Sequence, residues 1–165
     1  MGQRLNIEII KNGKVIGNCY YHWSAYTLSS LIETNTVIEN YDELLKQNLP
    51  DKVLITKMFE NCASYDFHTG GFNGAGLSKD SYEYMCNKYP NYEFRKAIDR
   101  NAGLIGITEK DIDDTRGWEE GRVTIDLDKE IERVINKWKD FPSSLVHKIT
   151  IVRSSHRGAV VNESD

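Results

Sequence analysis

The chain has 165 residues and a formal net charge of −4 at neutral pH, with 39% hydrophobic and 28% charged residues. This length and composition predict one globular domain with a sizeable core. The negative charge argues against sequence-independent binding to DNA or RNA, which requires a basic surface that releases counterions.

The N-terminal part is predicted to begin with a β-hairpin. Two strand-like runs, residues 4–10 and 15–23, flank Asn12-Gly13, which tolerates the positive φ angles of a tight turn. Ser24 can cap a helix that follows, and helical spacing of apolar residues resumes at Val37. Strands followed by helices are therefore expected in this part of the chain.

A glycine-rich run over residues 68–76 is predicted to be neither helix nor regular strand, because glycine raises the entropic cost of both. In chain order, the other predicted elements are a helix from Asp51 with Val53, Leu54, Met58, Phe59 and Cys62 inward, a helix from Ser78 to about Asn87, strands at 104–108 and 123–127, a helix at 129–141 and a strand at 145–152.

These elements predict an α+β fold, an antiparallel β-sheet with an N-terminal hairpin and helices packed on one face. Residues 1–153 would form the single domain, and the polar residues 154–165 a flexible tail. Cys19, Cys62 and Cys86 are odd in number, so a disulfide framework is not expected. Without an apolar run of about 18 residues or an apolar signal core, no membrane span is expected, and a reducing cytoplasm fits best.

The segment Arg116–Arg122 (Arg-Gly-Trp-Glu-Glu-Gly-Arg) combines two guanidinium groups, an indole and two carboxylates between glycines. Trp118 offers a flat face for a purine, and the arginines offer forked donors for phosphate or carboxylate oxygens. The alternative is a surface turn in which both arginines pair with Glu119, Glu120 or Asp114. On this segment alone, the ion-paired turn is the more common arrangement.

A second dense cluster, residues 22–27, lies where a strand passes into a helix. The N-terminus of a helix attracts phosphate, and Trp23 and Tyr26 could enclose a purine there. The alternative is a helix cap with two core aromatic residues.

The glycine-rich run permits two interpretations. It could be a flexible surface connection, or a nest of backbone N–H groups that binds anionic oxygens. No Gly-Lys-Ser/Thr follows it, so it is not a nucleotide-binding P-loop. His68-Thr69 beside it suggests a phosphoesterase, but the second His-x-Thr unit of such enzymes is missing. The four histidines are scattered, and no metal site or cofactor is expected.

Four segments together resemble a phage family, the Thoeris anti-defence protein one family. They are residues 1–9, 20–27, 101–105 and 115–122. The resemblance implies a non-enzymatic protein that sequesters cyclic ADP-ribose isomers made by bacterial TIR proteins and so blocks effector activation. It further implies a homodimer or a hexamer built from three dimers, located in the host bacterial cytoplasm, with a second site for cyclic di- or trinucleotides.

Carried to this chain, the resemblance and the clusters above give two sets of candidate residues. The cyclic ADP-ribose site would use Tyr92, Asn101 and Arg116, with Trp23, Tyr26, Trp118 and Arg122 nearby. The cyclic oligonucleotide site would use Gly74, Ala75, Gly76 and Arg95. Removal of Arg116 is expected to weaken ligand binding and to leave the fold intact.

Two other function classes remain open from the sequence. A nucleotide-signal-degrading phosphoesterase would depend on His68 or on the acidic residues 111–120. An inhibitor that binds a host defence protein directly would more naturally display an exposed apolar patch or a strongly acidic surface, and −4 is a weak charge for the latter.

Overall fold

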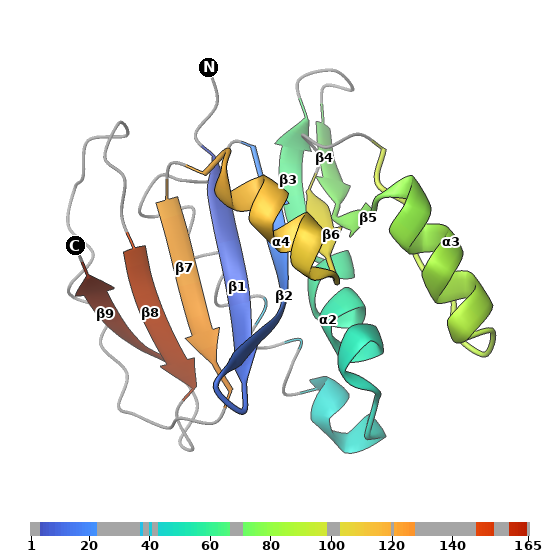
Figure 1. The fold of residues 1–165 in the computed structure, drawn as a ribbon, viewed down its shortest axis with the longest axis horizontal. Coiled ribbons are helices and arrows are strands. Elements are labelled where there is room, and N and C mark those ends of the chain that lie inside the picture. Colours follow the sequence, from blue (N-terminus) through green and yellow to red (C-terminus); the bar gives the residue numbers. More distant parts are fainter. Residues whose placement is uncertain are drawn as a thin grey trace.

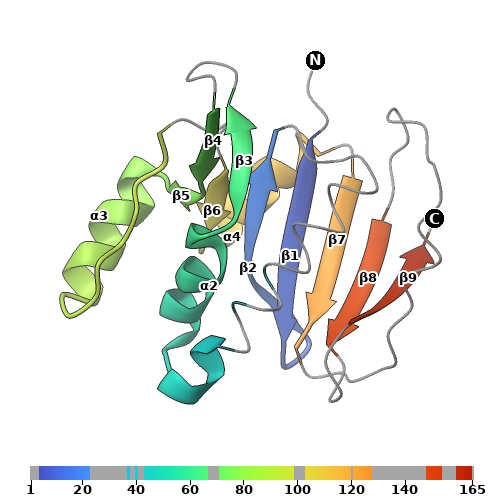
Figure 2. The same ribbon diagram turned by 180° about the vertical axis from the view of Figure 1, so that it is seen from behind.

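The computed structural model describes residues 4–22, 37, 40, 43–66, 71–98, 103–119, 121–127, 148–153 and 159–164 (Figures 1 and 2). The strands are β1 (Leu5–Lys11), β2 (Lys14–Tyr21), β3 (Ala63–Asp66), β4 (Gly71–Gly74), β5 (Gly76–Leu77), β6 (Leu104–Gly106), β7 (Gly121–Asp126), β8 (Lys148–Arg153) and β9 (Ala159–Ser164). The helices are the 3-10 helix η1 (Leu45–Gln47), α2 (Asp51–Glu60), α3 (Lys79–Lys88) and α4 (Glu109–Arg116). The predicted helices after Ser24 and at 129–141 lie outside the described residues.

The N-terminal hairpin is confirmed. Strands β1 and β2 are antiparallel, and both turn residues have positive φ, 53° at Asn12 and 75° at Gly13. These angles are those of a two-residue turn whose twist matches the flanking strands. The hairpin forms the centre of the main sheet, because β2 also pairs with β6 and β1 also pairs with β7.

The α+β class is confirmed, but the main sheet is mixed and not antiparallel. Its seven strands have the order β5-β6-β2-β1-β7-β8-β9. Pairs β1–β7, β7–β8 and β5–β6 are parallel, and the other three are antiparallel. Strand direction depends on how distant segments cross over, which the alternation of residues within one strand does not reveal.

The glycine-rich run is partly regular, which corrects the sequence prediction. Strand β4 pairs with β3 in a separate two-stranded sheet, and β5 follows at the edge of the main sheet. Close backbone packing explains the glycine at position 76. A Cβ there would lie 2.5 Å from the backbone nitrogen of Ala97. Here glycine permits a close approach of two backbones, and it does not mark a loop.

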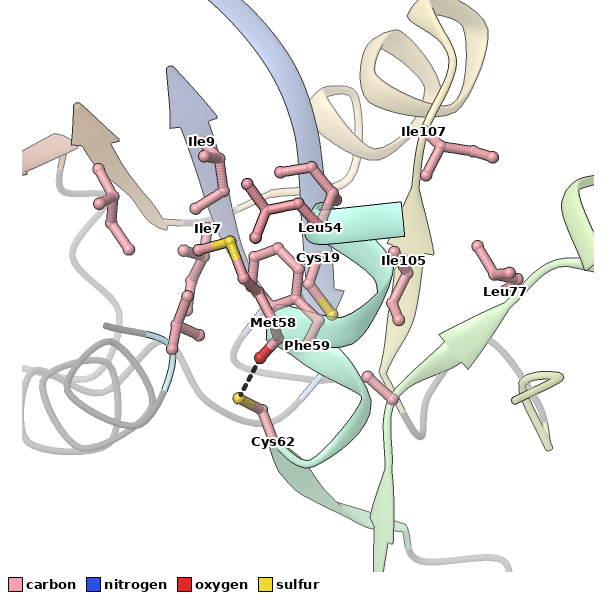
Figure 3. Packing of buried hydrophobic residues seen from close by; sticks show 14 of the residues in the cluster. Ile7, Ile9, Cys19, Leu54, Met58, Phe59, Cys62, Leu77, Ile105 and Ile107 are labelled. Atoms are coloured by element: carbon pink, nitrogen blue, oxygen red, sulfur yellow. Dashed lines mark hydrogen bonds between the residues drawn. The ribbon is translucent and has the colours of Figure 1, made fainter. Parts of the chain in front are cut away.

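The hydrophobic core lies on one face of the sheet, where odd-numbered residues of β1 and β2 point toward α2 (Figure 3). Ile7, Ile9 and Cys19 pack with Met58 and Phe59, and all five are fully buried. The inward residues that the sequence predicts for this helix, Val53, Leu54, Met58, Phe59 and Cys62, are all buried. The apolar spacing of residues 51–62 thus identified the core helix correctly.

The opposite face of the sheet is covered by α4, which lies in front of the strands in Figure 1 and behind them in Figure 2. Adjacent residues of β2 show the two faces. A Cβ on Gly17 would meet Ile55 of α2, whereas the amide of Asn18 donates to Thr115 of α4. The helices therefore do not all pack on one face. Helix α4 has only two buried residues, Ile112 and Thr115, so its apolar pattern is too weak to predict it.

At the C-terminal end the sequence predicts a flexible tail over 154–165, whereas Ala159–Ser164 forms strand β9. It pairs antiparallel with β8 over six residues. The β-branched residues Val160 and Val161 suit a strand once a neighbouring strand supplies backbone partners. None of the described helices is both long and apolar enough to cross a membrane.

Candidate functional site

The candidate site is a set of polar residues on the sheet face beneath α4. It consists of Asn6, Glu8, Asn18, Thr115, Arg116, Glu119 and Arg122, called here the polar-face cluster. Strand alternation produces it. Asn6 and Glu8 of β1 point to the face opposite Ile7 and Ile9, and Asn6 lies beside Arg122 of β7 in the sheet register. Asn18 comes from β2, and the C-terminal end of α4 and the turn after it supply Thr115, Arg116 and Glu119.

Arg116 forms a two-pronged ion pair with Glu8. Its Nε donates to Oε2 at 2.6 Å and its Nη2 to Oε1 at 2.7 Å. The Glu8 side chain is only 2% exposed, while that of Arg116 is 35% exposed. The hydrogen bond to Glu8 raises the pKa of Arg116 above its ordinary value. The guanidinium therefore compensates a buried carboxylate as well as presenting an outer edge to solvent.

Arg122 pairs with Glu119, as the ion-paired alternative for this segment expects. Its Nε lies 2.9 Å from Oε1 of Glu119, and its Nη2 also donates to that oxygen. Arg122 Nε is also 3.7 Å from Oε2 of Glu8, so both arginines lie beside one buried carboxylate. The partner of Arg116, in contrast, is none of the three acids named from the sequence.

Amide side chains link the ion pairs to the sheet. Asn6 donates to Oε2 of Glu119 at 3.2 Å, and Nδ2 of Asn18 donates to Asn6 at 2.9 Å and to Thr115 at 2.7 Å. Asn6 and Asn18 are fully buried. Such a network fixes the position of Glu119, because each buried amide has few alternative partners.

An aromatic group borders the cluster. Trp118 makes an edge-to-face contact with Tyr20, with ring centroids 5.4 Å apart and an interplanar angle of 74°. The Tyr20 hydroxyl shares a 2.8 Å hydrogen bond with Nδ1 of His22. The half-buried indole belongs to the residue immediately before Glu119, in the turn after Arg116, so it borders the polar-face cluster.

Of the residues predicted for the cyclic ADP-ribose site, the fold brings Arg116, Trp118 and Arg122 together. Tyr92 does not join them, because it follows the C-terminal end of α3, far from the end of α4 that carries Arg116 (Figures 1 and 2). Trp23, Tyr26 and Asn101 lie outside the described residues.

Sequence reasoning missed Glu8, Asn6 and Asn18. The available signal was weak, because polar residues that alternate with apolar ones in a strand normally indicate a solvated face. Nothing local indicates that a helix 108 positions away in sequence covers Glu8.

The residues predicted for the second site are adjacent in space, but not as an anion-binding nest. The guanidinium of Arg95 lies over Gly74, in the space that a Cβ would take. The backbone N–H groups of Ala75, Gly76 and Leu77 donate to the carbonyl groups of Cys62, Gly103 and Arg95, at 3.1, 3.1 and 2.9 Å. Because these three donors are already used, they offer nothing to a ligand, and the nest interpretation is wrong for them.

Glu60 lies beside Arg95 and is poorly compensated. Its Oε2 accepts from Lys57 at 3.3 Å, whereas its Oε1 is buried without a partner among the described residues. Burial raises the pKa of Glu60 above 4.5, and this effect outweighs the attraction of Lys57 and Arg95. The folded protein therefore binds a proton at Glu60 more tightly than the unfolded chain does.

Glu60→Gln is accordingly expected to stabilise the protein at neutral pH. The penalty for the charged carboxylate is absent well below pH 4.5, develops as pH rises through the folded pKa, and is complete above it. Thermal melts from pH 4 to 8 should show a higher Tm for Glu60→Gln only at the upper end. Glu83→Gln is the control, because Glu83 is an exposed residue of α3, and its substitution should change the Tm little at any pH. A lower Tm for Glu60→Gln at pH 7 would show that the ion pairs dominate.

Within the described ranges, no group of three or more His, Cys, Asp or Glu residues could hold a metal ion. Comparisons of the chain with protein families, curated proteins and solved structures find no match. What the polar-face cluster can do therefore follows from its own residues: two half-buried guanidinium groups of fixed orientation beside an indole can hold an anion attached to a ring.

Proposed function

We propose that this protein binds and sequesters a cyclic ADP-ribose isomer made by a bacterial TIR protein, and so prevents activation of the host defence effector. The observation that supports the proposal most is the convergence of Arg116, Arg122 and Trp118 at one end of the polar-face cluster. The resemblance to a phage anti-defence family gives the identity of the ligand. In this proposal the protein acts in the host cytoplasm and performs no chemistry on its ligand.

The arginines can bind phosphate without leaving their carboxylates. Each uses Nε and Nη2 for a glutamate, and Nη1 of each has no partner in the described part of the chain. A diphosphate bridging the two Nη1 edges would add to the existing ion pairs. Because the carboxylates already hold both side chains in place, binding costs little side-chain entropy.

The carboxylates also limit the electrostatic attraction. Glu8 and Glu119 balance the formal charges of Arg116 and Arg122. An anion is therefore attracted less by net charge than by the geometry of the donors and by stacking on the indole. This arrangement favours a ligand that carries both phosphates and an adenine over inorganic phosphate or simple polyanions.

The proposal includes a second site and self-association. At the second site, Arg95 is the remaining cationic candidate beside Gly74, since the N–H groups of residues 75–77 are already used. A cyclic di- or trinucleotide bound there would depend on side chains and not on a backbone nest. We further propose assembly as a homodimer or as a trimer of dimers.

Arg116→Lys tests the first site while preserving a cation beside Glu8. Lysine lacks the fork, so affinity for a cyclic ADP-ribose isomer in calorimetric titration is expected to fall about tenfold or more. Lys110→Ala is the control, because Lys110 lies on the same helix, is largely exposed, and pairs with Asp114 outside the cluster. If wild type binds no isomer, the proposed function is wrong. If Arg116→Lys binds as tightly as wild type, the ligand lies elsewhere.

A further inference from the structure

A cavity of about 490 Å³ lies beside α3, away from the polar-face cluster. Its lining consists of Tyr82, Cys86, Pro90, Tyr92, Glu93 and Phe94. Tyr82 and Cys86 are one helical turn apart on α3, and the chain folds back beyond Pro90 so that Tyr92 and Phe94 face the same space. The two rings have centroids 6.4 Å apart and are tilted by 41°.

The loop that forms this cavity is held in place from two sides. The N–H of Tyr92 donates to the carbonyl of Tyr89 at 3.1 Å, which closes the turn after α3. Lys57 of α2 donates to the backbone carbonyl of Glu93 and lies over the Phe94 ring, 5.2 Å from its centroid. These contacts use the backbone of Glu93, so its carboxylate is not needed to hold the loop.

The lining has the composition of a cation-binding aromatic cage. Among the described residues that line the cavity are three aromatic rings and one carboxylate, and none of them is a lysine or an arginine. The phenol of Tyr82 is neutral at physiological pH, as tyrosine ordinarily is, and the hydrogen bond with Cys86 raises its pKa further. Ring faces attract cations through their negative quadrupole, and a nearby carboxylate adds to that attraction. Lys57 of α2 contacts the Phe94 ring, and its positive charge is compensated by the ion pair with Glu60.

We propose that this cavity binds a small organic cation, an alkylammonium group enclosed by Tyr82, Tyr92 and Phe94 and paired with Glu93. The same groups disfavour a nucleotide, because Glu93 would repel phosphate and the nearby ammonium of Lys57 already binds Glu60 and the backbone carbonyl of Glu93. The site is separate from the proposed nucleotide site and does not depend on it. Its ligand class is defined by the positive charge, since a neutral group of equal shape would gain only apolar contact.

Choline and its neutral isostere 3,3-dimethyl-1-butanol provide the test, because they differ in charge and hardly in shape. Each is titrated into the full-length protein and followed by NMR chemical-shift changes. Choline is expected to bind saturably and about tenfold more tightly than the isostere, with shifts centred on residues 82–94. Equal affinities, or no saturation by choline, would overturn the proposal.

Variants locate the binding. Tyr92→Ala and Glu93→Gln change exposed side chains, so the fold should be retained, and each should weaken choline binding about threefold or more. Tyr84→Ala is the matched control. Tyr84 is an exposed tyrosine of α3, the helix that carries Tyr82 and Cys86, but it does not line the cavity. An unchanged affinity in Glu93→Gln and Tyr92→Ala, or an equal loss in Tyr84→Ala, would contradict the assigned site.

Discussion

Arg116→Ala is expected to lower the free energy of unfolding by about 3 kcal/mol, because it leaves the carboxylate of Glu8 buried without its main partner. Arg122 cannot replace Arg116 as the partner of Glu8, because its Nε and Nη2 already donate to Glu119. For a chain of this length the Tm should fall by roughly 6–12 °C. Denaturant unfolding followed by circular dichroism measures the effect. The sequence-based expectation that loss of Arg116 leaves the fold unaffected is therefore revised.

Substitution of the other member of the ion pair, Glu8→Gln, should lower the free energy of unfolding by less. In Glu8→Gln the remaining guanidinium is about one-third exposed and can be hydrated, whereas in Arg116→Ala the remaining carboxylate is almost fully buried. Combining the two substitutions should recover part of the loss, because no buried charge then remains uncompensated at Glu8. If Glu8→Gln destabilises the protein more than Arg116→Ala does, the buried carboxylate of Glu8 is not the cause of the loss of stability in Arg116→Ala.

Gly76→Ala is the second large effect expected on stability. The added methyl group would lie 2.5 Å from the backbone nitrogen of Ala97 and 2.6 Å from the carbonyl carbon of Lys96. Backbone atoms on this side cannot rotate away, so β5 must separate from residues 96–97. A loss of about 3 kcal/mol is expected, at the upper end for overpacking, and thermal unfolding should show it.

Gly117→Ala is the matched control for that substitution. Gly117 has φ −66° and ψ −19°, which alanine adopts readily. The atom nearest to an added Cβ would be the carbonyl oxygen of Asp114, at 3.3 Å. Stability should change by less than about 1 kcal/mol, because a favourable backbone effect offsets the tight contact. Similar losses at both positions would mean that glycine is needed for flexibility and not for close packing.

Local patterns predicted the elements whose signals are local. The Asn12-Gly13 turn, the apolar spacing within α2, the Ser78 cap of α3 and the alternation within β7 all appear in the structure as expected. In each case the residues that determine the element lie only a few positions apart in the sequence. The fold class followed from these elements.

Nonlocal features could not be predicted in this way. The directions of β7 and β8 beside β1 depend on crossovers, and β4 and β5 contain glycines for reasons that appear only when their neighbours are known. Helix α4 did have a signal, since Thr108 accepts a hydrogen bond from the N–H of Asp111, an ordinary N-cap. Its polar composition obscured that signal, because it covers a polar sheet face.

The same reason explains the partial success at the candidate site. Arg116, Trp118 and Arg122 are close in sequence and remained together in the fold. Glu8 joins them from the first strand, and its contribution depends on burial that no nearby residue indicates. Tyr92 was grouped with them as the aromatic residue that the family resemblance implies, and the fold separates it from them.

Mass spectrometry of the bound small molecule tests the central claim most directly. The purified protein is incubated with the products of an active TIR protein, washed free of unbound nucleotide and then heat-denatured. The account predicts release of a cyclic ADP-ribose isomer of unchanged mass in stoichiometric amount, and recovery of a smaller amount from Arg116→Lys. Recovery of a smaller hydrolysis product, or of no nucleotide from the wild-type protein, would contradict it.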